Sequence, residues 1–395
     1  MDDPTLTPID SDTLNMDSSA NDQWAFMRPL SAMALADIQA AFQLFSQSNL
    51  VSDDTPGHLA AQIQDPNLIN PWGVAFGSNG DFWVNNNGTG TATLYSVDPN
   101  TDATTAAPLV VTIAPPVGAS GPAAPTGIVF NTDTSGFMLN GKPAAFIMDT
   151  EDGTISAWNG GTTTTLEVDN SNNAAAGDDT VPPAQGIGAV YKGLAIGTAN
   201  GTTMLYAANF RHGTVDVFDD KFQQVNSLTD GALPAGYAPF NVAVLNGNLF
   251  VTFAQQNQFK HDDVAGAGNG FVDEFSLGGQ LLARVASQGP LDSPWGMAIA
   301  PSDFGQFAGD LLVGNFGDGT ISAFDLNNDD QFMGKLLGID GKPVTIPDLW
   351  TLTPGNGGSA GSTGKIYFTS GVENESKGLF GSLSPVPGTS EFAIG

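Results

Sequence analysis

The chain is dominated by short apolar runs separated by polar turns rich in glycine, proline and asparagine. The run at 71–76, Pro-Trp-Gly-Val-Ala-Phe, predicts a strand entered from a tight turn. The run at 81–86, Asp-Phe-Trp-Val-Asn-Asn, predicts a partner strand that ends in polar residues. Runs of this length bounded by turn residues are typical of β-strands. The pattern therefore predicts a protein of strands and turns.

The segment at 71–76, which we call the repeated phrase, recurs along the chain, and its repetition predicts the fold. Its counterparts are the segments 125–129, 191–195, 239–243, 294–298 and, more weakly, 349–352. They begin between 48 and 66 residues apart, and each is followed by a second apolar strand and then a third strand that alternates apolar and polar residues. A repeat of this size with about four strands per unit is the signature of a β-propeller. We predict an all-β, six-bladed β-propeller with four-stranded blades.

The sixth unit ends without an outer strand, whereas a lone strand at 42–52 precedes the first unit. We predict that this N-terminal strand closes the ring, since closure leaves no exposed sheet edge. The domain organisation that follows is an acidic, disordered segment with a short helix at 1–41, the propeller at 42–385 and a flexible tail at 386–395.

The charge and the cysteine content of the chain exclude several classes of function. The net charge is −30, with 11 Lys and Arg against 41 Asp and Glu. Because phosphate binding needs clustered Lys and Arg, we expect no nucleic-acid partner. The chain has no cysteine, which excludes disulfides and thiol chemistry, and it lacks an apolar run long enough to span a membrane. The composition resembles that of bacterial proteins secreted directly to the outside, so we expect an extracellular or cell-surface protein, although no export signal is visible.

Three phrases carry a resemblance to a known family. The segments 70–75, 208–218 and 262–273 resemble a bacterial family of secreted, uncharacterised six-bladed propeller proteins, and the chain is more distantly similar to NHL-repeat and gluconolactonase-like propellers. The resemblance covers about residues 45–385. It implies a propeller fold, an axial pocket and often a calcium ion, but the gluconolactonase ligands cannot be matched one by one here.

Two sets of loops are expected on one face of the propeller, namely those entering the first strands and those joining second to third strands. Function commonly resides on loops held by a rigid scaffold. Aromatic residues mark the entering loops, and polar residues mark the ends of the second strands. The predicted ligand-binding residues are Trp72, Asn86, Asp149, Asn209, Phe240, Trp295, Asn315 and Trp350. For the tryptophans we expect packing in the core or lining of a pocket, and the functional alternative is stacking on a sugar ring.

The insertion at 255–270 and the residues after it place oxygen donors around glycines, as calcium-binding turns do. The predicted metal ligands are Asp262, Asp263, Asn269 and Asp273. The alternative is a solvated hairpin loop whose Asp and Asn residues form turns.

Two histidines are expected in neighbouring loops of the third and fourth blades. His212, His261 and the adjacent Arg211 are the predicted catalytic residues, because paired imidazoles can bind a transition metal or exchange protons near neutral pH. The alternative is that both histidines lie in wet surface loops.

Two functions remain open. The first is a secreted binding module that holds a small molecule, a glycan or a protein on its loop face, with or without calcium. The second is a metal-dependent hydrolase or lyase of the gluconolactonase-like propeller type.

Overall fold

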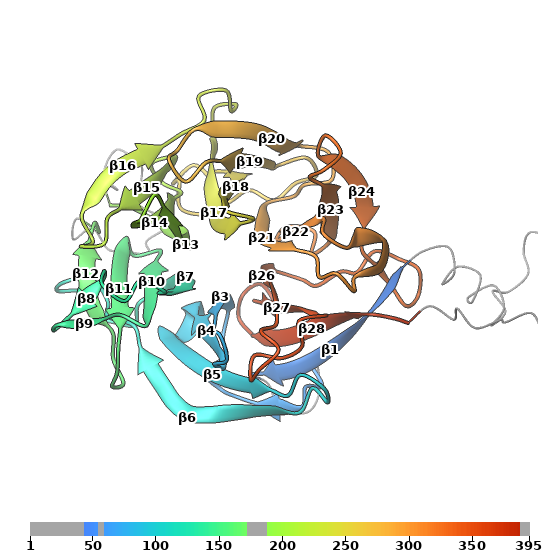
Figure 1. The fold of residues 1–395 in the computed structure, drawn as a ribbon, viewed down its shortest axis with the longest axis horizontal. Coiled ribbons are helices and arrows are strands. Elements are labelled where there is room, and N and C mark those ends of the chain that lie inside the picture. Colours follow the sequence, from blue (N-terminus) through green and yellow to red (C-terminus); the bar gives the residue numbers. More distant parts are fainter. Residues whose placement is uncertain (1–42, 54–58, 172–187, 388–395) are drawn as a thin grey trace, which may run out of the picture. The chain divides into compact units, whose positions relative to one another are not determined.

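A computed structural model describes residues 43–53, 59–171 and 188–387, which all belong to one compact unit, Phe42–Pro387. Within these residues, six sheets of strands stand around a central axis (Figure 1). The all-β propeller prediction is confirmed. The acidic, disordered segment with a short helix predicted at 1–41 lies outside the described residues, as do residues 388–395 of the predicted tail. Among the described residues no helix is long and apolar enough to cross a membrane.

Each blade is an antiparallel sheet whose strands follow one another from the axis outward. Blade 1 consists of β3 (Pro71–Ala75), β4 (Phe82–Asn86), β5 (Thr91–Val97) and β6 (Thr104–Thr112). Blade 2 consists of β7 (Pro125–Phe130), β10 (Phe146–Thr150), β11 (Thr154–Trp158) and β12 (Thr165–Asp169). Blade 3 consists of β13 (Tyr191–Ala199), β14 (Thr202–Asn209), β15 (Thr214–Phe218) and β16 (Gln224–Leu228).

The next two blades repeat this order. Blade 4 consists of β17 (Tyr237–Leu245), β18 (Asn248–Gln255), β19 (Phe271–Phe275) and β20 (Leu281–Ser287). Blade 5 consists of β21 (Pro294–Ile299), β22 (Leu311–Asn315), β23 (Ile321–Asp325) and β24 (Gln331–Lys335). Short strands outside the four-strand pattern are β2 (Ile63–Gln64), β8 (Met138–Leu139), β9 (Lys142–Pro143) and β25 (Leu337–Gly338).

Blade 6 combines the two ends of the described chain. It consists of β26 (Leu349–Pro354), β27 (Ile366–Ser370), β28 (Leu379–Pro385) and, as its outer strand, β1 (Leu44–Ser52). Strand β1 runs antiparallel to β28, with Phe45 opposite Pro385 and Ser52 opposite Leu379. The predicted closure by an N-terminal strand is therefore present in the structure.

The repeated phrase explains how the blades meet at the axis. In every blade the pairing between the first and second strands shifts register at this phrase. Such a bulge re-aims a side chain. The glycines that follow allow neighbouring first strands to approach closely: a Cβ on Gly127 would lie 2.2 Å from the backbone nitrogen of Leu194, and one on Gly73 would lie 2.4 Å from the Thr126 carbonyl oxygen.

Candidate functional site

Aromatic side chains fill the axis where the first strands begin. The indoles of Trp72 and Trp350 are stacked with centroids 3.5 Å apart, and Trp295 meets Trp72 edge-on at 6.0 Å. Phe210 and Phe240 complete this aromatic plug, which is defined here by these five residues. Each of the five is at most 3% exposed. The plug separates two regions of different chemistry along the axis.

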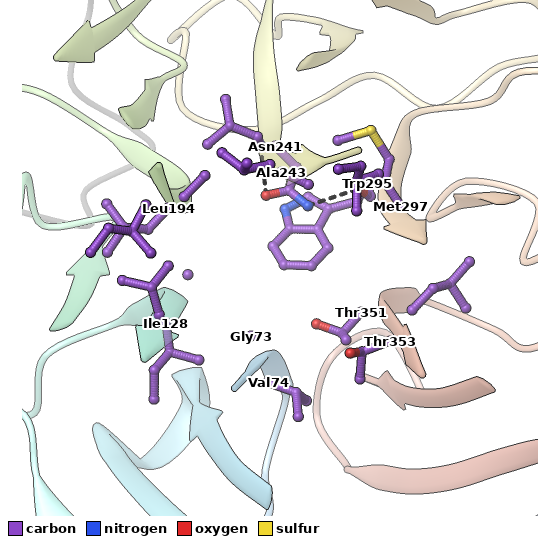
Figure 2. Close-up of a pocket in the computed structure, with 18 of the residues that line it drawn as sticks. Gly73, Val74, Ile128, Leu194, Asn241, Ala243, Trp295, Met297, Thr351 and Thr353 are labelled. Atoms are coloured by element: carbon purple, nitrogen blue, oxygen red, sulfur yellow. Dashed lines mark hydrogen bonds between the residues drawn. The ribbon is translucent and has the colours of Figure 1, made fainter. Parts of the chain in front are cut away.

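The first region is an axial cavity of about 280 Å³ lined by the first strands of all six blades. Figure 2 shows the Trp295 indole reaching into it, with Ile128, Leu194 and Thr351 around it. Asn241 also lines the cavity, but its amide nitrogen is committed to the carbonyl oxygen of Trp295, at 2.8 Å. None of the lining residues is charged. The cavity therefore offers little chemistry of its own.

The second region lies on the other side of the plug and is centred on Lys192. Its side chain is 3% exposed, and its ammonium forms ion pairs with Glu151 and with Asp262 Oδ1, the latter at 3.2 Å. The Nζ atom also lies 5.2 Å from the ring centroid of Trp72. We call the set Lys192, Glu151, His261, Asp262 and Glu375 the axial polar site.

Loops from three further blades bring the other members to Lys192. Glu151 lies in the turn between β10 and β11, and Glu375 lies in the turn between β27 and β28. His261 and Asp262 come from the insertion between β18 and β19, where the Asn257 side chain accepts a hydrogen bond from the backbone N–H of His261, at 3.2 Å. The imidazole Nδ1 lies 2.8 Å from Asp262 Oδ1.

Two asparagines of blade 1 orient the glutamates. Asn87 donates from Nδ2 to Glu151 Oε2 at 2.7 Å, and Asn70 donates from Nδ2 to Glu375 Oε2 at 2.7 Å. Asn70 in turn accepts a hydrogen bond from the indole N–H of Trp350, at 3.0 Å. The carboxylates are thus held by contacts that extend down into the aromatic plug.

The charges in the site perturb one another. Burial opposes the charge on Lys192, but the neighbouring Glu151 and Asp262 raise the pKa of its ammonium above the usual value. Burial would raise the pKa of Asp262, but Lys192 holds it well below its usual range. Burial, with a contribution from Glu151, raises the pKa of Glu375 to about 7. The site therefore combines a fixed ammonium, a fixed carboxylate and a carboxyl group that titrates near neutral pH.

The three predicted catalytic residues are not brought together. His261 belongs to the axial polar site, and the guanidinium of Arg211 interacts electrostatically with Asp262. The His212 imidazole instead lies 3.1 Å from the Asn209 amide and lines a separate pocket with Asp216 and Ser227. Within the described residues no hydrogen bond or ion pair joins the two histidines. The structure thus corrects the expectation of a shared histidine site: the turn at 210–213 directs His212 back onto its own blade.

The four predicted metal ligands are also dispersed. Asp273 lies within strand β19 and forms an ion pair with Arg284. The Asn269 amide donates to the carbonyl oxygen of Val264, at 2.9 Å, and burial raises the pKa of Asp263 to about 6. Asp262 alone joins a group that could hold a metal, with Glu151 and His261, whose ligand atoms lie within 4.8 Å of one another.

This group does not fit calcium. Calcium prefers six to eight oxygen ligands, whereas one of the three donors is an imidazole nitrogen. Both carboxylates are moreover bound to the ammonium of Lys192. The three residues therefore do not form a site for a resident calcium ion.

The predicted ligand-binding residues are all buried. Trp72, Phe240, Trp295 and Trp350 form the plug beneath the axial polar site rather than its surface. At the ends of the second strands, Asn86 bonds to Thr93, Asn209 to Asp216 and Asn315 to the carbonyl oxygen of Pro290. Asp149 accepts from Thr126 and from the backbone of Gly127, and burial raises its pKa to about 7. Ligand contact by these residues stays a prediction.

The sequence places Lys192, Glu151 and Glu375 in the loops of the predicted face, but it did not mark them as site residues. The signal for Lys192 was present in the repeat, because it is the charged residue at the second position of the phrase, where the other copies carry Trp, Thr or Phe. No comparable signal marked the glutamates. They come from turns of blades 2 and 6 and meet Lys192 only once the ring is closed.

The chain is similar to two uncharacterized proteins of Acanthamoeba polyphaga mimivirus. R648 is 31% identical over 329 residues, which cover 81% of this chain and 76% of R648. L690 is 31% identical over 330 residues, which cover 81% of each chain. No family model matches. The expected bacterial, secreted origin stays a prediction, since these relatives are viral.

A solved structure supports the fold alone. The soluble aldose sugar dehydrogenase from Escherichia coli, in its apo form, aligns with a TM-score of 0.50 over 87% of this chain and 100% of the dehydrogenase, at 13% sequence identity.

Proposed function

The chain belongs to the family of the mimivirus proteins R648 and L690, and we propose that it is a binding module that holds a ligand with a positively charged group at the axial polar site. The supporting observation is Asp262. Its side chain is 43% exposed, and Lys192 keeps it ionised. Its Oδ1 faces Lys192 and His261, whereas Oδ2 makes no hydrogen bond within the described residues. One oxygen is therefore free to receive a cationic group from solvent.

The surrounding charge favours the same class of ligand. The whole chain carries a net charge of −30. Within the site, Glu151 and Asp262 face Lys192 and Arg211, and Glu375 adds a further negative charge as the pH rises through about 7. Such a field raises the local concentration of cations and speeds their association. A small amine, an amino sugar or the Lys or Arg side chain of a protein partner would satisfy this chemistry. The extracellular or cell-surface setting remains a prediction.

The test uses glucosamine and glucose as probes, because the two differ in a single ammonium group. Glucosamine should raise the melting temperature through mass action, and glucose should leave it unchanged. Asp262→Asn should abolish the response, whereas Asp340→Asn, at an exposed site outside the axial polar site, should keep it. Equal responses to both sugars, or a response that survives in Asp262→Asn, would refute the proposal.

A second candidate is an acid–base enzyme, a hydrolase or lyase of small substrates. The observation that favours it is Glu375, whose pKa of about 7 suits a general acid. With 1,5-gluconolactone as the probe, Glu375→Gln should lower turnover by about 100-fold. His261→Ala should also lower it, and His212→Ala should not, since His212 lies in another pocket. Turnover no faster than in buffer would discard this candidate.

A further inference from the structure

Lys192 lies where a divalent cation would be expected. Glu151, His261 and Asp262 offer ligand atoms that lie within 4.8 Å of one another, and the Lys192 ammonium is bonded to the carboxylates of both acidic members. Metal-binding carboxylates in proteins surround a positive centre in the same manner. Here the positive centre is part of the chain.

The surroundings of Lys192 are those of a built-in ion and not of a surface lysine. The residue is 2% exposed, and its Nζ lies over the rings of Trp72, at 5.2 Å, and Phe210, at 5.9 Å. Aromatic faces attract cations through their quadrupole. A buried ammonium is costly unless it is paired and hydrogen-bonded, and this one has both carboxylate partners and aromatic faces.

We infer that the ammonium of Lys192 is the axial cation of this propeller: it fills the position that a divalent ion would take between Glu151 and Asp262, and it keeps the native site free of metal. A divalent ion held by the same two carboxylates would lie close to the ammonium, and two positive charges at short range in a buried site repel strongly. The inference does not depend on the proposed ligand, which would bind at the outer oxygen of Asp262.

Removing the ammonium should convert the group into a metal site. Lys192→Met keeps an unbranched side chain that is one atom shorter, and it deletes the charge. Two carboxylates would then lose their cation, and the imidazole of His261, which is 5% exposed and whose Nε2 has no hydrogen-bond partner, would be available as a third ligand. A donor set of one imidazole and two carboxylates suits Mn²⁺ or Zn²⁺ better than Ca²⁺.

The experiment is a titration with Mn²⁺ followed by tryptophan fluorescence, because Trp72 lies close enough to Lys192 to be quenched by a paramagnetic ion at its position. Lys192→Met should bind Mn²⁺ at least about tenfold more tightly than the wild type. Lys192→Arg, which keeps the charge, should behave like the wild type. The double variant Lys192→Met/Asp262→Asn should lose the gained affinity. Circular dichroism checks that each variant is folded.

Two results would overturn the inference. One is a wild-type protein that binds Mn²⁺ as tightly as Lys192→Met does. The other is a folded Lys192→Met variant that, like the wild type, does not bind Mn²⁺ at all. If Lys192→Met does not fold, Mn²⁺ binding by the wild type and by Glu151→Gln tests the inference instead. Mn²⁺ binding by the wild type that Glu151→Gln abolishes contradicts a resident ammonium, and no Mn²⁺ binding by the wild type supports it.

Discussion

The buried contact between Lys192 and Glu151 controls the electrostatics of the axial polar site at the scale of single residues. The two side chains are 3% and 11% exposed, so water screens their charges little. The exposed pair of Lys342 and Asp340 differs in this respect, with side chains 79% and 60% exposed and 3.9 Å between the charged atoms. Breaking the first pair leaves a buried charge short of a partner, whereas breaking the second leaves two solvated groups.

We predict that Glu151→Gln lowers the free energy of unfolding by about 3 kcal/mol, because removal of one partner strands the other charge in the interior. Asp340→Asn should change it by less than about 0.5 kcal/mol, as expected for an exposed pair. Urea denaturation at pH 7 measures both. A loss below about 1 kcal/mol in Glu151→Gln would mean that Asp262 alone compensates Lys192.

Glu375 predicts a pH dependence of stability. Burial and the nearby Glu151 raise the pKa of its carboxyl from the ordinary value of 4.5 to about 7. The folded state therefore binds this proton more tightly than the unfolded state does. The stabilisation by the protonated form is fully present below about pH 4.5 and is lost as the pH rises through 7.

The matching variant is Glu375→Gln, which mimics the protonated carboxyl. Between pH 5 and pH 8 the wild type should lose about 2 to 3 kcal/mol more stability than this variant. Urea denaturation of both proteins at the two pH values isolates Glu375 from other buried acids such as Asp149, which both proteins share. Parallel pH profiles would show that Glu375 titrates normally.

Some residues of the axial polar site could be predicted from the sequence, and others could not. His261 and Asp262 were predicted because they stand out in a long insertion, and both belong to the site. Lys192 was placed in a loop of the predicted face but was not predicted as a site residue, although it is the charged residue at an otherwise uncharged position of the repeat. A local pattern shows which residue is unusual but not which distant turn will pair with it. That pairing depends on the arrangement of the blades around the axis.

At the scale of elements, the register shift in each first strand is the feature that shapes the axis. It places Trp72, Trp295 and Trp350 in one buried cluster, although all three were also among the predicted ligand-binding residues. Their burial matches the expectation that they pack in the core or line a pocket. The glycines after Trp72 and Trp295 then allow the next blade to approach: a Cβ on Gly296 would lie 2.4 Å from the carbonyl oxygen of Trp350.

We predict that Gly127→Ala lowers the free energy of unfolding by at least about 2 kcal/mol, since a Cβ there would meet the backbone of Leu194 at 2.2 Å. Gly231→Ala is the matched control, because a Cβ on Gly231 would have no neighbour within 4 Å. It should change stability by less than about 1 kcal/mol. Thermal denaturation of both variants tests the role of close approach, and equal stabilities would contradict it.

At the scale of the whole molecule, blade 6 shows how a strand far away in sequence completes a sheet. Strand β1 lies beside β28, and its residue Leu50 is fully buried in a cluster with Phe82 and Tyr367. Counting strands along the chain was sufficient to predict this closure, because one unit lacked a strand and one strand lacked a unit. Counting could not show which loops meet above the axis.

Because β1 closes the ring, we predict that substitutions at its buried and exposed positions affect the free energy of unfolding differently. Leu50→Asp should lower the free energy of unfolding by about 3 kcal/mol or more, because it places an unpaired charge between blades 6 and 1. Gln47→Asp changes an exposed position of the same strand and should have an effect below about 0.5 kcal/mol. Calorimetry compares the two. Similar melting temperatures would mean that β1 contributes little to the ring.

The same closure determines how the ring would respond to a pulling force. Gln43 donates from its amide to the carbonyl oxygen of Val386 at 3.0 Å, and the backbone N–H of Val386 donates to Leu44 at 2.8 Å, so the chain enters and leaves the propeller at one point. Tension between these two points would load the β1–β28 hydrogen bonds one after another, as in unzipping. The inner strands would bear no load until β1 had peeled away. Blade 6 is therefore the first blade expected to open under force. The axial polar site would keep its geometry as long as β1 remains paired with β28.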